Sequence, residues 1–196
     1  MITWKETHQL IFEDLKRFGP RRTGSVKQGI YRIFISHSFR ITFWYRIGYY
    51  CIHTSNPIAK LVYPIVWAIH THNQYLTGIQ LPFSVVAKGG LLFPHFSGII
   101  IHPQAQIGSL CTIHQCVTIG TERHKSLGGK VIIGDRCVLS TGAKIIGPLT
   151  IGNDVIVGAN AVVTKDVVDG SVMVGIPARE LNRNGKEYCL LRHQLL

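Results

Sequence analysis

Negative charge is missing from most of the first 121 residues of this sequence. After Asp14 the next acidic residue is Glu122, so residues 15–121 hold no carboxylate side chain. The chain carries 21 Lys and Arg against 10 Asp and Glu, a formal net charge of +11. This excess predicts an anionic partner: nucleic acid, a membrane surface or a phosphorylated ligand. Nucleic acid is not expected, because no recognised binding motif accompanies the charge.

Long apolar runs, a leader peptide and paired cysteines are absent as well. The most apolar stretch, residues 58–69, contains Lys60 and Pro64 and is shorter than the about 20 apolar residues of a transmembrane helix. No cationic and apolar leader opens the chain. The five cysteines form no CxxC pair, so we expect a reduced, cytoplasmic protein whose cysteines fill the core. Hydrophobic residues make up 46% and charged residues 16%, which excludes a disordered, highly charged chain.

The residues before Gly78 have helical periodicity. We expect helices within residues 1–18, 25–53 and 57–75. One interpretation is that these helices pack on the rest of the chain or on another subunit. The other is that their interleaved bases and aromatic residues touch anionic lipid as a peripheral membrane surface. The expected division of the chain is a helical N-terminal region (1–78), a β domain (79–180) and a C-terminal tail (181–196).

Beyond Gly78 an aliphatic or aromatic residue recurs every six positions, and a small or apolar residue usually follows it four positions later. The series runs through Leu81, Ala87, Phe93, Ile101, Ile107, Ile113, Ile119, Ile133, Leu139, Ile145, Ile151, Val157 and Val163. A six-residue period matches neither an α-helix nor the two-residue alternation of a simple strand. It fits a flat-sided coil in which each hexad forms one short parallel strand and one corner. Both apolar positions then point inward, and glycine and polar residues take the corners.

Several segments add specificity to the repeat. They are Tyr45-Arg46-Ile47-Gly48, Phe93-Pro94-His95-Phe96-Ser97-Gly98, Val117-Thr118-Ile119-Gly120, Gly142-Ala143-Lys144-Ile145-Ile146-Gly147 and Val174-Gly175-Ile176-Pro177-Ala178-Arg179. With the hexads they resemble the hexapeptide-repeat acyltransferases, and among these most closely the serine acetyltransferases. The resemblance covers roughly residues 40–182. It implies a mainly β fold, a left-handed parallel β-helix preceded by an α-helical region, and acetyl transfer from acetyl-CoA to a hydroxyl. It also implies a homotrimer or dimer of trimers with the active site between subunits.

His95 is the candidate general base. Neutral imidazole has a pKa near operating pH and suits removal of a hydroxyl proton. His95 stands two places after Phe93, an outward position in the hexad phase. The catalytic histidine of the family falls at this position. The alternative is an ordinary surface histidine.

The family's carboxylate that orients this histidine is missing here. Gln80 stands at the matching position, and Pro94 replaces the adjacent acidic residue of many members. Gln80 can fix the tautomer of His95 through a hydrogen bond, but it cannot stabilise imidazolium as a charge would. A backbone carbonyl, or Glu122 from a neighbouring subunit, is the alternative partner.

His114 is expected close to His95 if two extra residues near Ser97–Ile99 shift the phase, because neighbouring strands lie about 4.8 Å apart. The pair then forms a shared substrate site, or a weak metal site together with His102. No metal is expected, because the carboxylates that usually support metal ligands are absent from this region. Corner-filling roles for His102 and His114 are the plainer interpretation.

Two further sites follow from the resemblance alone. The interruption of the hexads at residues 121–130 corresponds to a loop that carries a substrate-binding histidine in the family; here His124 and Lys130 are its candidates. The alternative is a solvated loop without a role. The pantetheine arm and phosphates of acetyl-CoA are expected along the later coils, at Gly142, Ala143, Gly158, Ala159, Lys165 and Arg179.

The acceptor is the least determined part of the reaction. Serine carries an ammonium group, which is bound poorly where no carboxylate is available. We therefore favour a sugar hydroxyl in polysaccharide biosynthesis over serine in cysteine biosynthesis. An inactive β-helix scaffold that binds a partner enzyme and a γ-type carbonic anhydrase are alternatives of other classes. Thioester turnover separates the first from an acetyltransferase, and bound zinc identifies the second.

Overall fold

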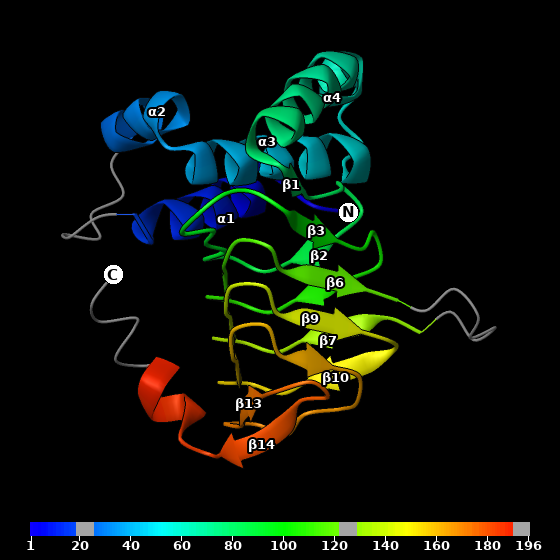
Figure 1. The fold of residues 1–196 in the computed structure, drawn as a ribbon. Coiled ribbons are helices and arrows are strands. Elements are labelled where there is room, and N and C mark those ends of the chain that lie inside the picture. Colours follow the sequence, from blue (N-terminus) through cyan, green and yellow to red (C-terminus); the bar gives the residue numbers. More distant parts are fainter. Residues whose placement is uncertain (19–25, 122–128, 190–196) are drawn as a thin grey trace.

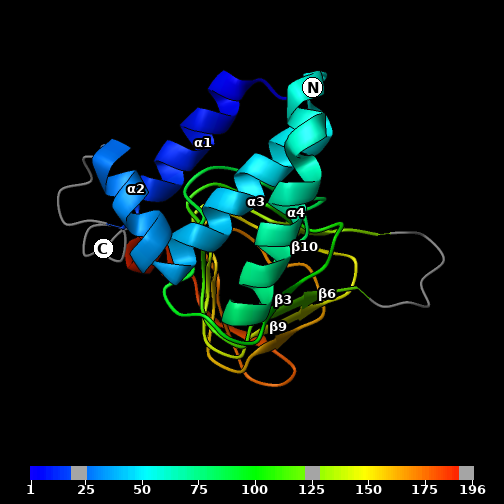
Figure 2. The ribbon, with the colours of Figure 1, turned by 90° about the horizontal axis from the view of Figure 1, so that it is seen from above.

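The fold is taken from a computed structural model, which describes residues 1–18, 26–121 and 129–189. Four helices precede a coil of short strands, and together α2, α3 and α4 cover one end of that coil (Figures 1 and 2). The expected helical region followed by a parallel β coil is therefore confirmed. The helices are α1 (Trp4–Lys16), α2 (Val26–Ile35), α3 (His37–His53) and α4 (Pro57–Thr77).

Side-chain caps set the ends of these helices. Thr3 and Glu6 form a capping box at the start of α1. Ser36 accepts a hydrogen bond from the backbone N–H of Phe39, so the helical stretch predicted over residues 25–53 is two helices, α2 and α3. Gly78 ends α4 with a φ of +64°, a conformation that favours glycine.

The coil has three sheets, which form the faces of a prism. Sheet A contains β1 (Ile79–Gln80), β3 (Ile99–Ile101), β6 (Thr118–Gly120), β9 (Lys144–Ile146) and β12 (Val162–Val163). Sheet B contains β2 (Val86–Ala87), β4 (Gln106–Ile107), β7 (Val131–Ile133) and β10 (Leu149–Ile151). Sheet C contains β5 (Thr112–Ile113), β8 (Val138–Leu139), β11 (Ile156–Val157), β13 (Val172–Val174) and β14 (Arg179–Asn182). The pairs are parallel except that of β13 with β14.

The register of the sheets explains the hexad phase. Val162 pairs with Lys144, 18 positions earlier, which is the turn of three hexads that the period predicts. Leu92 bridges to Thr112, 20 positions on, because two extra residues enter the turn before β3. Thr118 pairs with Lys144, 26 positions on, because the interruption after Gly120 adds eight. Every residue of the predicted six-residue series is buried in one continuous core.

The corners demand unusual backbone conformations. The turns between sheets C and A place Cys116, Gly142 and Asn160 at φ between 55° and 74°, one coil apart. A similar column lies between sheets B and C, where Leu110 and Arg136 also adopt positive φ. Glycine and polar residues take corners as expected at Gly142, Asn160 and Arg136, and Leu110 and Cys116 take them as well. Four cysteines are buried as expected, whereas Cys116 is exposed in its turn.

Candidate functional site

The turns that lead from sheet C to sheet A stack into one edge of the prism, which we name the His95 edge. It consists of residues 94–98, 114–117, 140–143 and 158–161. Six of the residues expected in the site lie on it: His95, His114, Gly142, Ala143, Gly158 and Ala159. The structure therefore brings the candidate base and the small residues of the candidate donor site onto one continuous strip.

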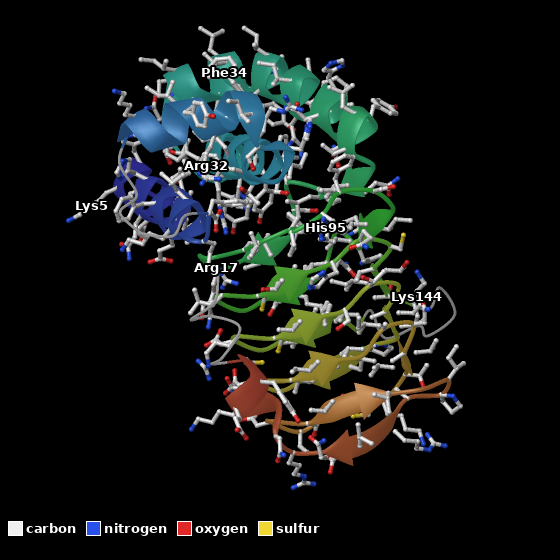
Figure 3. The ribbon with its side chains drawn as sticks, turned by 60° about the vertical axis from the view of Figure 1, so that its left-hand side comes forward. Lys5, Arg17, Arg32, Phe34, His95 and Lys144 are labelled. Carbon is white, nitrogen blue, oxygen red and sulfur yellow. The ribbon has the colours of Figure 1, made fainter. Side chains whose placement is uncertain are left out.

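His95 is exposed at the upper end of this edge, directly below α4 (Figure 3). The turn that contains His95 is hydrogen-bonded to the C-terminal end of α4: the backbone N–H of Ser97 donates to the carbonyl oxygen of Thr77 at 2.8 Å. The ring centroids of His95 and His114 lie 6.3 Å apart, with the ring planes inclined by 43°. The two imidazoles are therefore neighbours on adjacent coils, as the inferred two-residue insertion requires.

Gln80 lies beside this edge rather than in it. Its side chain is exposed on β1 in sheet A, and it lines a cavity of about 390 Å³ with Gln74 and Tyr75 of α4. Among residues 1–18, 26–121 and 129–189, no hydrogen bond joins Gln80 to His95. In this arrangement, then, Gln80 does not hold the imidazole.

Gln115 is a further residue of the His95 edge, and it was not among the predicted site residues. The bridge between Leu92 and Thr112 sets an offset of 20 residues, so Gln115 stands one coil below His95. Its side-chain oxygen Oε1 is buried and lacks a hydrogen-bond partner within the described parts of the chain. A buried, unpaired amide oxygen is costly, which makes Gln115 a second candidate to interact with the imidazole or the acceptor. The signal in the sequence that identifies Gln115 is the 20-residue offset between these two coils, which places it below His95.

Carboxylates gather on other parts of the molecule. Asp135 and Asp154 lie on the edge between sheets B and C, where they pair with Lys88 and Arg136 respectively. The backbone N–H of Ser109, assisted by Lys88, holds the pKa of Asp135 below its usual value. Asp14 is buried against Arg46. None of the turns that make up the His95 edge contains an acidic residue.

The third edge, between sheets A and B, carries two of the predicted lysines and His102. Lys130 and Lys165 are both exposed on it, so sheet A separates them from His95. His102 lies there too, accepting from the backbone N–H of Gln104 and contacting Thr121 Oγ1 at 3.2 Å. These contacts support a corner role for His102 and separate it from the two site histidines. His124 lies outside the described residues.

A metal site of three side chains does not form in the parts of the chain that the structure describes. His95 and His114 have no third histidine, cysteine or carboxylate gathered with them there.

The strip expected to bind acetyl-CoA provides small side chains rather than free backbone groups. The backbone N–H groups of Gly142, Ala143 and Gly158 all donate within the coil, to Gln115, Ser140 and Met173. Lys144, which was not among the predicted contacts, projects from sheet A beside the strip (Figure 3). Its ammonium group donates to the carbonyl of Cys116 at 2.6 Å and to Thr118. Arg179 is exposed at the start of β14, at the far end of the coil.

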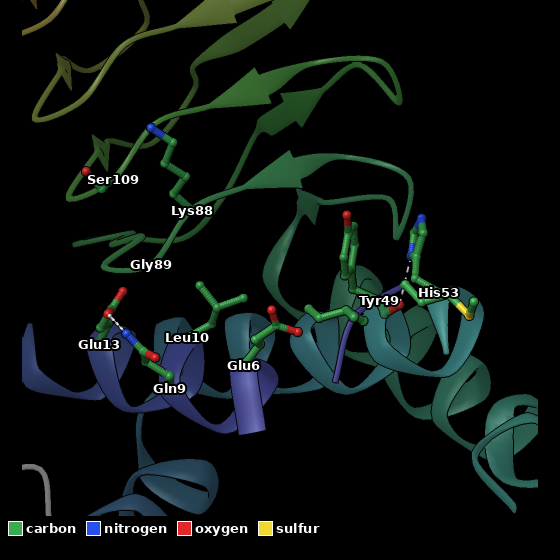
Figure 4. Close-up of a pocket in the computed structure, with 11 residues that line it drawn as sticks. Glu6, Gln9, Leu10, Glu13, Tyr49, His53, Lys88, Gly89 and Ser109 are labelled. Carbon is green, nitrogen blue, oxygen red and sulfur yellow. Dashed lines mark hydrogen bonds between the residues drawn. The ribbon is translucent and has the colours of Figure 1, made fainter. Parts of the chain in front are cut away.

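A separate cavity of about 740 Å³ lies between α1, the end of α3 and the turn at Lys88 (Figure 4). Glu13 bonds to Gln9 on one wall, and His53 stacks on Tyr49 on the other, with ring centroids 4.0 Å apart. None of the residues expected in the site lines this cavity. This cavity is therefore separate from the residues that the sequence predicts for the site.

Comparison with known proteins agrees with the repeat. The family profile described as "Bacterial transferase hexapeptide (six repeats)" matches residues 126–165. The serine acetyltransferase of Mycobacterium tuberculosis is 36% identical over 111 residues, which cover 56% of this chain and 48% of that protein. The serine acetyltransferase of Helicobacter pylori is 34% identical over 128 residues, which cover 62% of this chain and 71% of that protein. This chain thus spans about half the length of the first relative and less than three quarters of the second.

The similarity extends to solved structures. Soybean serine acetyltransferase complexed with serine superposes with a TM-score of 0.73 at 25% identity, covering 90% of this chain and 70% of that one. The match therefore includes the helical region as well as the coil.

Proposed function

Because the chain belongs to the serine acetyltransferase family of hexapeptide-repeat proteins, we propose that it transfers acetyl from acetyl-CoA to a hydroxyl group, with His95 as general base. The observation that carries this proposal is the exposed imidazole of His95 at the head of a strip of small residues. Such a strip leaves room for an extended thioester substrate beside the base. The left-handed sense of the coil, a cytoplasmic location and the division of the chain at residues 78 and 180 are part of the proposal.

The proposed reaction is a direct transfer. His95 takes the proton of the acceptor hydroxyl as its oxygen attacks the thioester carbonyl carbon. The tetrahedral intermediate then collapses, the carbon–sulfur bond breaks, and the CoA sulfur takes the proton from the imidazolium. The products are an acetyl ester and free CoA, and His95 returns to its neutral form. His114 stands beside the base and is proposed to contact the acceptor.

We assign the donor to the lower part of the His95 edge. The pantetheine arm runs past Gly142, Ala143, Gly158 and Ala159, where bulky side chains are absent. Arg179 and Lys165 supply cations for the phosphates, and Lys144 is added to them because it flanks the strip.

A trimer is proposed because sheet A alone separates the His95 edge from Lys130 and Lys165. In a threefold assembly one edge of a subunit faces a different edge of its neighbour, and the base and these lysines then meet. Apolar side chains on the outer faces of the sheets support such a contact: Val86, Ile100 and Ile132 are each between 39% and 46% exposed.

Serine is the acceptor that the comparisons support best, because the relatives carry that name and the soybean enzyme was solved with serine. Nothing in them supports the sugar preference drawn from the sequence. A saccharide hydroxyl remains the second candidate on one observation: the His95 edge contains no carboxylate to pair with the ammonium of serine.

The proposal is tested with the His95→Ala variant. Turnover of acetyl-CoA should fall by about a hundredfold or more, since removal of a general base has that effect, while acetyl-CoA binding measured by calorimetry stays unchanged. His8→Ala, which removes an exposed histidine on α1, is the control and should retain full turnover. Wild-type turnover in His95→Ala would remove this residue from the mechanism.

A further inference from the structure

Helix α4 exposes a broad apolar side, while its buried side is mixed. Its buried positions are Ala59, Val66, His70, Asn73 and Thr77. Its outward positions include Ile58, Leu61 and Ile65, whose side chains are 69%, 79% and 64% exposed. An ordinary surface helix turns its apolar stripe toward the core and a polar face toward solvent, so the exposed apolar side of α4 is unusual.

Helix α2 also exposes apolar residues. It lies with α4 on the side of α3 that is turned away from the coil (Figure 1). Tyr31 and Phe34 on α2 are 63% and 76% exposed. We name the exposed residues of the two helices the apical surface: Ile30, Tyr31, Phe34, Ile35, Ile58, Leu61, Val62, Ile65, Trp67, Tyr75 and Leu76. A surface of this kind marks an interaction site.

The charges around the apical surface identify what it binds. Lys27 and Lys60 are exposed on α2 and α4, and Arg32 and Arg40 are partly exposed nearby. No acidic residue occurs in α2, α3 or α4. A second copy of the chain would oppose this surface with the same positive charges and would gain no compensating ion pair. A negatively charged partner is complementary to it.

We propose that the apical surface docks on the headgroup region of an anionic lipid bilayer. Exposed aliphatic residues enter the acyl boundary, tyrosine and tryptophan lie at the headgroup level, and the lysines contact lipid phosphates. The attachment is peripheral, since none of the helices in the described residues is long and apolar enough to cross a membrane. The apical surface ends at Leu76, next to Thr77, whose carbonyl holds the His95 turn. Docking therefore brings the candidate site close to the lipid surface.

The test is co-sedimentation of the full chain with vesicles. Vesicles of phosphatidylcholine with 30 mol% phosphatidylglycerol should bind the protein, and pure phosphatidylcholine should bind it several-fold less. The double variant Leu61→Gln/Ile65→Gln should weaken binding by about tenfold or more, because two exposed aliphatic side chains no longer enter the bilayer. Lys27→Glu/Lys60→Glu should weaken binding to the anionic vesicles alone.

Matched controls lie at the opposite end of the coil. Leu181 is 64% exposed on β14, so Leu181→Gln removes an equivalent leucine, and Lys186→Glu removes an exposed lysine; both should bind as the wild type does. Equal binding to both vesicle types, or equal loss in the control variants, would overturn the proposal. A failure of the wild type to bind vesicles would also overturn it. Light scattering would then test the apical surface as a self-association surface, because in that case Leu61→Gln/Ile65→Gln should lower the mass of the assembly. Turnover with soluble acceptor should be unchanged in the apical variants, which separates this proposal from that of the enzymatic activity.

Discussion

Asp14 and Arg46 form a buried ion pair that fastens the helical region to the coil. Arg46 Nε lies 2.9 Å from one carboxylate oxygen of Asp14, Arg46 Nη2 lies 3.2 Å from the other, and both residues are at most 2% exposed. Arg46 also donates to the carbonyls of Ala87 and Lys88, and Asp14 accepts from the backbone N–H of Leu91. The last acid before the long stretch without carboxylates is thus consumed by structure and does not reach the His95 edge.

Removing one partner of this pair should be severely destabilising. In Asp14→Leu the guanidinium of Arg46 stays buried without a counter-charge, and the free energy of unfolding should fall by about 3–5 kcal/mol. Urea denaturation followed by circular dichroism measures the loss. Adding Arg46→Met to Asp14→Leu should recover part of it, because the unpaired charge is gone. The neighbouring variant Glu13→Gln, which alters a hydrogen bond with Gln9 and a weaker electrostatic effect on Arg46, should stay within about 0.5 kcal/mol of the wild type. A double variant less stable than Asp14→Leu alone would contradict this account.

His70 should make stability depend on pH. Its ring is buried against Phe83, Nε2 lies 2.8 Å from the carbonyl oxygen of Leu81, and burial lowers the pKa of His70 to about 4. Between this value and the ordinary value near 6.5 the unfolded chain binds more protons, so stability falls as pH drops through that range and levels off below it. The total loss is about 3 kcal/mol.

Urea denaturation at pH 7 and at pH 4.5 measures this dependence. His70→Gln should remove most of the slope, whereas His72→Gln, which changes an exposed histidine on the same helix, should keep it. An unchanged slope in His70→Gln would assign the pH dependence to other groups.

The six-residue period was sufficient to predict the coil, because burial of two positions in each hexad dictates both strand and corner. Every predicted inward residue, from Leu81 to Val167, is buried. The break at Ser36 was missed, since a serine cap competes locally with an otherwise continuous helical pattern. The two-residue insertion near Ser97–Ile99 was predicted, but only His114 was inferred from it, and Gln115, which the same offset places below His95, was missed. The role of Lys144 could not be read from the sequence, because it depends on which carbonyls a stacked coil presents.

A carboxylate introduced beside His95 should reveal which glutamine orients it. If Gln80 is the orienting residue, Gln80→Glu should keep or raise turnover and shift the acidic limb of the kcat/KM profile to higher pH, because a carboxylate stabilises imidazolium. Gln106→Glu places the same change on sheet B and should leave the profile unchanged. A shift in Gln115→Glu and none in Gln80→Glu would transfer the role to Gln115.

The last prediction concerns the acceptor and follows from where the carboxylates lie. An enzyme that selects serine must pair the ammonium group, and an unpaired, desolvated charge costs several kcal/mol. Within one chain the described acids lie away from the His95 edge, and Asp14 is already engaged by Arg46. Only Glu122 or a neighbouring subunit is left to supply the counter-charge. We expect L-serine, the acceptor that the relatives favour, to be turned over only when such a counter-charge is in place; thiol release from acetyl-CoA, measured with L-serine beside a panel of sugars and nucleotide sugars, tests this.

A substitution at Pro94 tests whether the missing counter-charge is what limits the use of L-serine. Pro94 directly precedes His95 in the turn and is partly buried. Pro94→Asp should lower KM for L-serine by about tenfold, the effect of one partly screened ion pair, and leave KM for acetyl-CoA unchanged. Asparagine has the shape of aspartate without its charge, so Pro94→Asn should not lower KM for L-serine. The acceptor 3-hydroxypropanoate lacks the ammonium group, so Pro94→Asp should not lower its KM. Efficient wild-type turnover of L-serine, with no turnover of any sugar, would establish serine as the acceptor and require a counter-charge from Glu122 or from the neighbouring subunit.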